Sequence, residues 1–215
     1  MSGKPAREAF RAREWAVVES HRTPARVQRY LSRLPYNWET CGATLRSFRE
    51  VVRRGEAHCL EAALAAAVVL EQHGYPPLLM SLESQDKLDH VLFVFRKRGL
   101  WGAVARSRDT GLHGRHPVFR NLRQLVWSYF DPYVDLTGRI TGYGVGNLYE
   151  LGAYDWRFAR RNVWRVERYL QEIPHRAFNS SDRRYAQLVA RYKAWRQHHP
   201  TGSPVYYDNR GQWML

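Results

Sequence analysis

Residues 55–64 have the sequence GEAHCLEAAL, which places Cys59 at the front of an alanine-rich run that continues to Gln72. Small and apolar residues in this run predict a helix that packs deep in the protein. A thiol at a helix N-terminus faces unpaired backbone N–H groups and the positive end of the helix dipole, and both favour the thiolate. The stretch therefore predicts a buried helix with a reactive cysteine in its first turn.

The segments after this helix predict a small antiparallel sheet. The helical pattern stops at His73-Gly74, and the prolines that follow prevent its continuation. Three strand-like runs come next, at 78–82, 90–95 and 100–107. His90 is the first residue of the second run, so we expect a histidine at the end of a strand that packs against the cysteine helix.

Pairing across the last two runs follows from the turn between them. If Arg98-Gly99 is a two-residue turn, Lys97 pairs with Leu100. Continuing that register places Ser107 opposite His90, with Asp109 one diagonal step beyond. Both side chains are therefore candidates for the group that orients the His90 ring.

The remaining sequence predicts helices and loops around this unit. Residues 1–54 predict N-terminal helices, 55–109 carry the cysteine-to-histidine unit, and 110–215 predict a helical and loop extension of the same single domain. The individual helices are expected at 5–21, 24–34, 43–54, 119–130, 156–172 and 181–198, and residues 205–213 predict a small hairpin.

The stretch from Gly55 to Asp109 resembles the transglutaminase-like superfamily, a branch of the papain-like fold. The similarity rests on Cys59 opening a helix, the LEQHGYP sequence at 70–76, His90 opening a strand and Trp101 on the following strand. The resemblance implies an α+β core with a nucleophile helix on an antiparallel sheet. It also implies a Cys-His-Asp triad that acts on amides, by hydrolysis or by acyl transfer.

This chain departs from that pattern at one position. The aspartate of the superfamily usually follows the strand tryptophan by about four residues, and Ala105 stands there in this sequence. The candidates for a replacement are Asp109, then Ser107, then Asp89, which precedes His90 but should point to the opposite face. The missing aspartate also favours an alternative hypothesis, an inactive relative that keeps the fold as a binding scaffold.

Other residues near the motif are candidate members of the same site. Asn37 or Trp38, in a loop before the cysteine helix, could supply a side-chain donor to an oxyanion hole beside the backbone N–H of Cys59. His58 is adjacent to the thiol, so it either influences that thiol or lies at the pocket rim. Cys41 is the rival thiol, but it lacks the helix-to-strand pattern and is interpreted as a structural or surface residue.

Charge defines a second alternative function. The chain has 34 Lys and Arg against 20 Asp and Glu, for a net charge of +14, and only four of the 34 are lysine. Arginine binds phosphate and carboxylate in a bidentate manner, which makes an acidic partner or nucleic acid possible. The arginines are scattered, so we expect any nucleic-acid binding to be weak and non-specific.

Composition limits the remaining classes. Hydrophobic residues make up 44% of the 215 residues, enough for a sizeable core. No apolar run approaches the ~20 residues of a membrane span, and the N-terminus lacks the apolar core of a secretory signal. Two cysteines predict free thiols, no metal site and a cytoplasmic setting. The sequence thus predicts a cysteine-dependent amide-bond enzyme that acts on a peptide or amide substrate without a cofactor.

Overall fold

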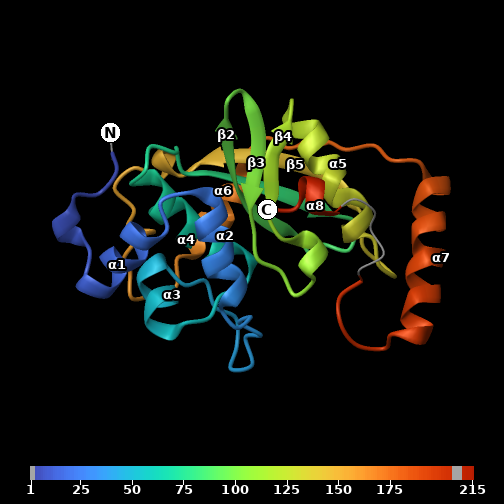
Figure 1. Ribbon diagram of the computed structural model, residues 1–215, viewed down its shortest axis with the longest axis horizontal. Coiled ribbons are helices and arrows are strands. Elements are labelled where there is room, and N and C mark those ends of the chain that lie inside the picture. The colour runs from blue at the N-terminus through green and yellow to red at the C-terminus, as the bar shows by residue number, and fades with distance from the viewer. Residues whose placement is uncertain (1–2, 205–209) are drawn as a thin grey trace.

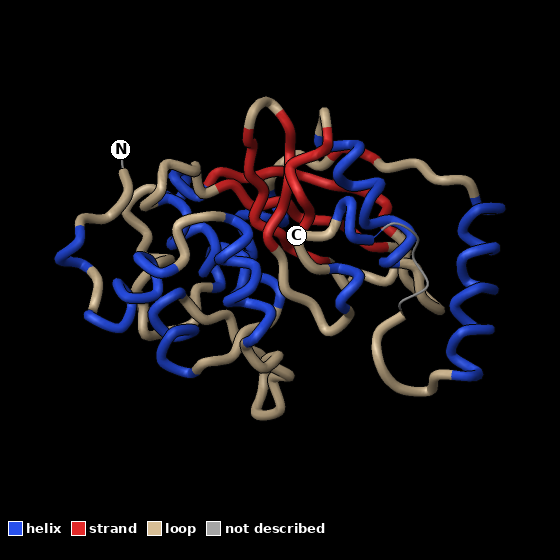
Figure 2. Tube along the Cα trace, in the orientation of Figure 1, coloured by secondary structure: helices blue, strands red, loops and turns tan. Residues whose placement is uncertain are grey.

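The computed structural model describes residues 3–204 and 210–215, and this part of the chain has an α+β architecture (Figures 1 and 2). Its strands form one antiparallel sheet in the order β4-β3-β2-β1-β5-β6. The strands are β1 (Leu78–Ser84), β2 (His90–Lys97), β3 (Leu100–Val104), β4 (Arg115–Phe119), β5 (Ile140–Asn147) and β6 (Arg176–Ala177).

Helices surround this sheet. The α-helices are α1 (Ala12–Ser20), α2 (Pro24–Arg33), α3 (Phe48–Arg54), α4 (Cys59–Glu71), α5 (Leu122–Tyr133), α6 (Trp164–Glu172), α7 (Asp182–His198) and α8 (Arg210–Trp213). Three short 3₁₀ helices are η1 (Arg7–Ala9), η2 (Thr110–Leu112) and η3 (Leu148–Leu151). None of the helices in the described part of the chain is long and apolar enough to cross a membrane.

The core lies on both faces of the sheet. Val91, Phe93 and Phe95 of β2 point to one face, where they join the buried side chains of α1–α4. Leu92 and Val94 point to the other face, where they join α5. Figure 1 shows α1–α4 gathered on one side of the sheet and α5 on the other. Strand β2 is covered on both faces and has a strand on each side, so it lies inside the protein.

Helix α4 lies at the centre of the first core. Every residue from Leu60 to Glu71 is buried, so the alanine-rich sequence does pack deep, as predicted. Gly55 adopts the left-handed conformation (φ 77°) that ends α3, which turns the chain back toward the start of α4. The backbone N–H of His58 donates to Glu61 Oε2 at 3.1 Å and caps the new helix. This turn and cap fix Cys59 as the first helical residue.

The predicted hairpin register is confirmed over the length of β3. Lys97 pairs with Leu100, and both turn residues have positive φ, 50° for Arg98 and 81° for Gly99, as in a type I′ turn. The expectation that Ser107 continues this ladder opposite His90 is wrong. Strand β3 ends at Val104, and on its other side His90 pairs with Leu82 of β1.

The side chain of Gln28 in α2 ends the β2–β3 ladder. Its Nε2 donates to the Ala105 carbonyl at 2.8 Å, and its Oε1 accepts from the Ala105 N–H at 2.9 Å. The side-chain amide of Gln28 thus hydrogen-bonds to both the N–H and the C=O of Ala105, as a neighbouring strand would. The chain then leaves the sheet and passes over the end of β2.

The structure corrects several predicted elements. The helix expected at 43–54 begins only at Phe48, because the backbone N–H of Arg46 donates to Glu61 and keeps the preceding residues extended. The helix expected at 5–21 is divided into η1 and α1, and the one expected at 156–172 begins at Trp164. Strands β4, β5 and β6 occupy segments for which the sequence predicted no strand.

The C-terminal region lies at one side of the molecule. Helix α7 buries none of its residues, although Tyr185, Leu188 and Val189 pack against the second core. Figure 1 shows it as the outermost helix on the α5 side. The predicted hairpin at 205–213 falls partly outside the described residues, and its described part, Arg210–Trp213, is the helix α8.

Candidate active site

Cys59 and His90 line one cavity of about 560 Å³ at the end of the sheet. This volume is in the range of small-molecule and peptide sites. His58 lines the same cavity, and the walls come from the loop at 36–39, the turn at 86–89, the segment 107–109 and parts of α6 and α7. The structure therefore brings Cys59 and His90 of the predicted motif together with the neighbouring His58, in a space that a substrate could enter.

The His90 ring is held by a backbone carbonyl. Its Nε2 lies 3.1 Å from the carbonyl oxygen of Leu112, the last residue of η2. The side chain is buried, with 4% of its surface exposed, and its ring lies 6.3 Å from the ring of Tyr129. A carbonyl only accepts, so this contact places the proton on Nε2 and leaves Nδ1 as the nitrogen that can face the thiol.

The environment of Cys59 favours the thiolate. Burial raises the pKa of the thiol, but hydrogen bonds and positive charge from His58 and His90 outweigh it and lower that pKa to about 5. The start of α4 adds unpaired backbone N–H groups beside the sulfur. Cys41, the other cysteine, is exposed and lies outside this cavity. The thiolate of Cys59 is therefore the nucleophile that this site offers at neutral pH.

His58 is the second histidine at the thiol. Its Nε2 lies 3.0 Å from the Thr44 carbonyl oxygen and 3.5 Å from Glu61 Oε1. Burial lowers the pKa of His58, but the contacts with Cys59, Glu61 and Thr44 raise it to about 9. The sequence pointed to His58 only as a neighbour of the thiol. Its partners are Thr44, 14 positions before it, and Glu61, three positions after it. Only the folded structure shows that the two meet at His58.

The expected orienting groups lie beside the site but do not hold His90. Ser107 Oγ accepts from the backbone N–H of Asp109 at 3.3 Å. Asp89 Oδ1 accepts from the backbone N–H of Ser84 at 3.0 Å, which ties it to the β1–β2 turn. Within the described residues, none of the three side chains bonds to the His90 ring. The expectation of Asp109 or Ser107 is therefore corrected to the carbonyl of Leu112.

Ala105, which stands at the position of the superfamily aspartate, is completely buried among apolar residues. Its backbone N–H and C=O are both hydrogen-bonded to the Gln28 side chain. A carboxylate at this position would lie in the second core, so the chain supplies the orienting group from η2.

Asn37 and Trp38 take different places from those expected of oxyanion donors. The Asn37 amide donates to Thr44 Oγ1 at 2.7 Å and to Glu61 Oε2 at 3.0 Å, so both of its N–H groups are engaged. Trp38 is 63% exposed, and its ring packs at 5.1 Å on the ring of Tyr36 at the cavity wall. The backbone N–H of Cys59 remains the oxyanion donor that the helix start provides.

The cavity has a different charge from the rest of the protein. Two of its described lining residues are Lys or Arg, namely Lys87 and Arg108. Six are carboxylates: Glu39, Asp86, Asp89, Asp109, Asp135 and Glu167. A chain of net charge +14 thus surrounds its reactive thiol with negative groups.

Many arginines have structural contacts away from this cavity. Arg49 pairs with Glu14 at 2.7 Å, and Arg157 pairs with Glu71 at 2.7 Å. Arg115 is fully buried, with its guanidinium 3.8 Å above the ring of Tyr129. These contacts account for part of the arginine content through packing and ion pairs.

No protein-family model matches this chain, and a search of curated proteins gives no match. Among the described residues there is also no group of three or more His, Cys, Asp or Glu that could hold a metal ion.

Proposed function

We propose that this protein is a cysteine-dependent amide-bond enzyme with a transglutaminase-like core, acting on a peptide or amide substrate. The observation that carries the proposal is the junction of α4 and β2. A thiol of lowered pKa opens a buried helix, beside a histidine whose far nitrogen is fixed by a carbonyl, and both line one cavity. This order of helix thiol, strand histidine and orienting group suits acyl transfer.

In the proposed reaction, the Cys59 thiolate attacks the substrate carbonyl carbon and a C–S bond forms. The negative charge on the carbonyl oxygen is stabilised by the backbone N–H of Cys59. His90, as an imidazolium, gives a proton to the departing nitrogen while the C–N bond breaks, and a thioester remains. Water or an amine then attacks the thioester, His90 takes the proton, and the C–S bond breaks to restore the thiolate.

The second candidate function is an inactive scaffold that binds a peptide in the same cavity. One observation favours it: within the described residues the His90 ring contacts a neutral carbonyl and no carboxylate. A carboxylate would stabilise the imidazolium during turnover, whereas a carbonyl only orients the ring and fixes its tautomer.

Acylation of the folded protein by p-nitrophenyl acetate separates the two candidates. We expect one acetyl group on Cys59, seen by intact mass and peptide mapping, followed by its slow release as acetate. The Cys59→Ala variant should lose both, whereas Cys41→Ser should lose neither. If Cys59 is acylated no faster than the exposed Cys41, the protein is a scaffold and the enzyme proposal fails.

A further inference from the structure

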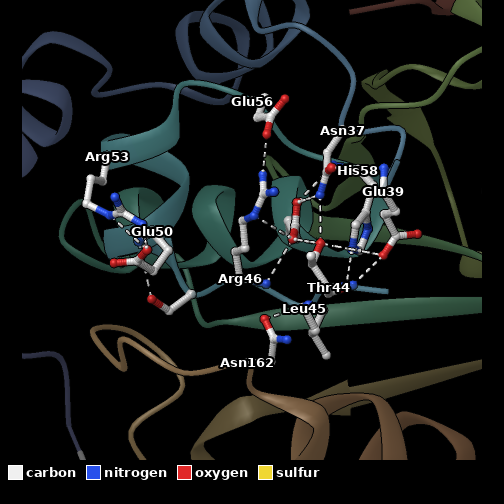
Figure 3. A network of polar contacts seen from close by, with 12 residues as sticks. Asn37, Glu39, Thr44, Leu45, Arg46, Glu50, Arg53, Glu56, His58 and Asn162 are labelled. Carbon is white, nitrogen blue, oxygen red and sulfur yellow. Dashed lines mark hydrogen bonds and ion pairs between the residues drawn. The ribbon is translucent and has the colours of Figure 1, made fainter. Parts of the chain in front are cut away.

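The ring of His58 is surrounded by acceptors. Its Nε2 lies 3.0 Å from the Thr44 carbonyl oxygen, 3.5 Å from Glu61 Oε1 and 4.0 Å from Glu39 Oε1. Figure 3 shows His58, Thr44 and Glu39 drawn together at this point. A carbonyl and two carboxylates around Nε2 favour the charged form of the imidazole, and the hydrogen bond between His58 and Cys59 favours it further.

Glu61 is the buried anion of this arrangement. Its side chain is fully buried, and it accepts from Asn37 Nδ2 at 3.0 Å, from Thr44 Oγ1 at 2.9 Å and from the backbone N–H groups of Arg46 and His58 at 2.9 and 3.1 Å. These four donors are neutral, so they position the carboxylate without cancelling its charge. A buried carboxylate requires a cation nearby.

Two cations compete for the charge of Glu61, and one of them is already paired. The Arg46 Nε lies 3.8 Å from Glu61 Oε1, and its Nη1 donates to Glu56 at 2.8 Å (Figure 3). Arg46 is therefore shared between two carboxylates, and the imidazole of His58, at 3.5 Å, lies closer to Glu61 than the guanidinium does.

His90 has a different environment. Its Nε2 contacts one neutral carbonyl, that of Leu112, and within the described residues no carboxylate bonds to its ring. Apart from the thiol, no anionic group in the described part of the chain holds the ring, so we assign the transfer of protons to and from a substrate to His90. The two histidines beside one sulfur are thus suited to different tasks.

We infer that His58, held protonated by Glu61, Glu39 and the Thr44 carbonyl, is the fixed cation that keeps Cys59 a thiolate, while His90 moves the proton during the reaction. His58 thereby acts as a positioning residue at the nucleophile, in the place where the resemblance implies a single histidine. The division of tasks rests on the proposed function, but the charge role of His58 is measurable without any substrate.

The charge role is tested by titrating the thiol in a Cys41→Ser background, by the ultraviolet absorbance of the thiolate and by the pH dependence of alkylation. We expect His58→Gln to raise the midpoint from about 5 by roughly two units or more. The matched control is His73→Gln. His73 follows the opposite end of α4 and donates to the Val18 carbonyl at 2.9 Å, and its replacement should leave the midpoint unchanged. An unchanged midpoint in His58→Gln, with a raised one in His90→Gln, would overturn the inference.

The proton-transfer role is tested with p-nitrophenyl acetate, whose leaving group needs no proton. In His90→Gln, we expect acylation of Cys59 to persist and thioester hydrolysis to slow by about 10²-fold, because water loses its base. In His58→Gln, hydrolysis of the preformed thioester should slow less than in His90→Gln, because the thiolate leaving group loses its cation but the base for water remains. If hydrolysis depends on His58 rather than on His90, the assignment of tasks is wrong.

Two further variants guard against misfolding of His58→Gln. Glu61→Gln keeps the shape of the buried group and removes its charge, and Glu39→Gln does the same at an exposed residue. We expect both to raise the thiol midpoint, Glu61→Gln more than Glu39→Gln. If neither does, His58 is not held charged by these carboxylates. If the wild type is not acylated but these shifts appear, the proposed enzyme fails and the fixed cation stands.

Discussion

The carbonyl oxygen of Leu112 lies 3.1 Å from Nε2 of His90, at the place where a cysteine triad would have a carboxylate. The carbonyl fixes the tautomer and the direction of the ring, but it contributes no full charge. In the proposed site, Leu112 orients His90, while His58, which lies 3.5 Å from Glu61, supplies the positive charge beside the thiolate.

The first prediction concerns the side chains that the sequence favoured. We expect Ser107→Ala and Asp109→Asn to leave the pH profile of Cys59 alkylation unchanged, and to change thioester hydrolysis by about twofold or less. The physical reason is that neither side chain bonds to the His90 ring. Nitrogen NMR of the histidine ring would check the tautomer, with the proton expected on Nε2. A loss of hydrolysis in Asp109→Asn comparable to that of His90→Gln would restore Asp109 as the orienting group.

The second prediction is the pH dependence of the thiol. With a lowered pKa of about 5, Cys59 is a thiolate at higher pH and a thiol below it. In Cys41→Ser we therefore expect the alkylation rate with iodoacetamide to rise with a midpoint at about pH 5 and to become level by neutral pH. The midpoint is the informative quantity, because a thiolate of low pKa is also a weaker nucleophile. A midpoint near that of an ordinary thiol would contradict the arrangement described here.

The third prediction uses the charge of the cavity. Six carboxylates of the described residues line it, against three cations, namely Lys87, Arg108 and the charged His58. We expect a cationic methanethiosulfonate reagent to modify Cys59 about tenfold faster than an anionic one of similar size, after correction for their rates with a small free thiol. The preference should shrink as salt is added. Cys41, measured on a Cys59→Ala background, is the control. An equal preference at both cysteines would show that the carboxylates of the cavity do not cause it.

The fourth prediction concerns Gln28, which ends the β2–β3 ladder. In Gln28→Ala the buried N–H and C=O of Ala105 lose their partners, so we expect a loss of about 2–4 kcal/mol in the free energy of unfolding. Urea denaturation measures it. Gln85→Ala is the control, because Gln85 also bonds to a backbone carbonyl, that of Thr137, but is exposed. Equal losses in the two variants would show that Gln28 has no special structural role.

The fifth prediction concerns the buried pair at the other end of α4. Arg157 Nε and NH2 donate to the two oxygens of Glu71 at 2.7 and 2.8 Å. We expect Arg157→Met alone to cost about 3–5 kcal/mol, because it leaves Glu71 buried without a partner. Adding Glu71→Leu should recover most of that loss. A double variant as unstable as the single one would mean that packing, rather than the charge, sets the cost.

Local sequence patterns were sufficient to predict the centre of this fold. The alanine-rich run gave α4, the apolar run after His90 gave β2, and Arg98-Gly99 gave the turn and its register. Each of these elements is determined by residues close in the chain. The expectation that Cys59 and His90 lie close together came from their order along the chain and from the resemblance to the transglutaminase-like superfamily.

Contacts between distant residues determine the parts that the sequence did not predict. The end of β3 depends on Gln28, 77 positions before Ala105. The charge on His58 depends on Thr44 and Glu61. The orientation of His90 depends on a backbone carbonyl, and because every residue type has one, the sequence cannot reveal this contact.

Strand β5 was missed because its glycines are typical of a loop. A Cβ at Gly146 would lie 2.6 Å from the Tyr169 ring, and one at Gly144 would lie 3.0 Å from His175. The glycines therefore allow α6 and the segment after it to approach the strand closely.

Because α4 and β2 are buried, substitutions in them have different consequences from substitutions in the cavity walls. The thiol and the histidine belong to these buried elements, where most substitutions disturb packing. The cavity walls come largely from loops and from α6, with Tyr192 of α7, and loop segments tolerate replacement and insertion. Changes in the loops can thus alter what the cavity admits while the positions of the thiol and the histidine are kept by the packed elements.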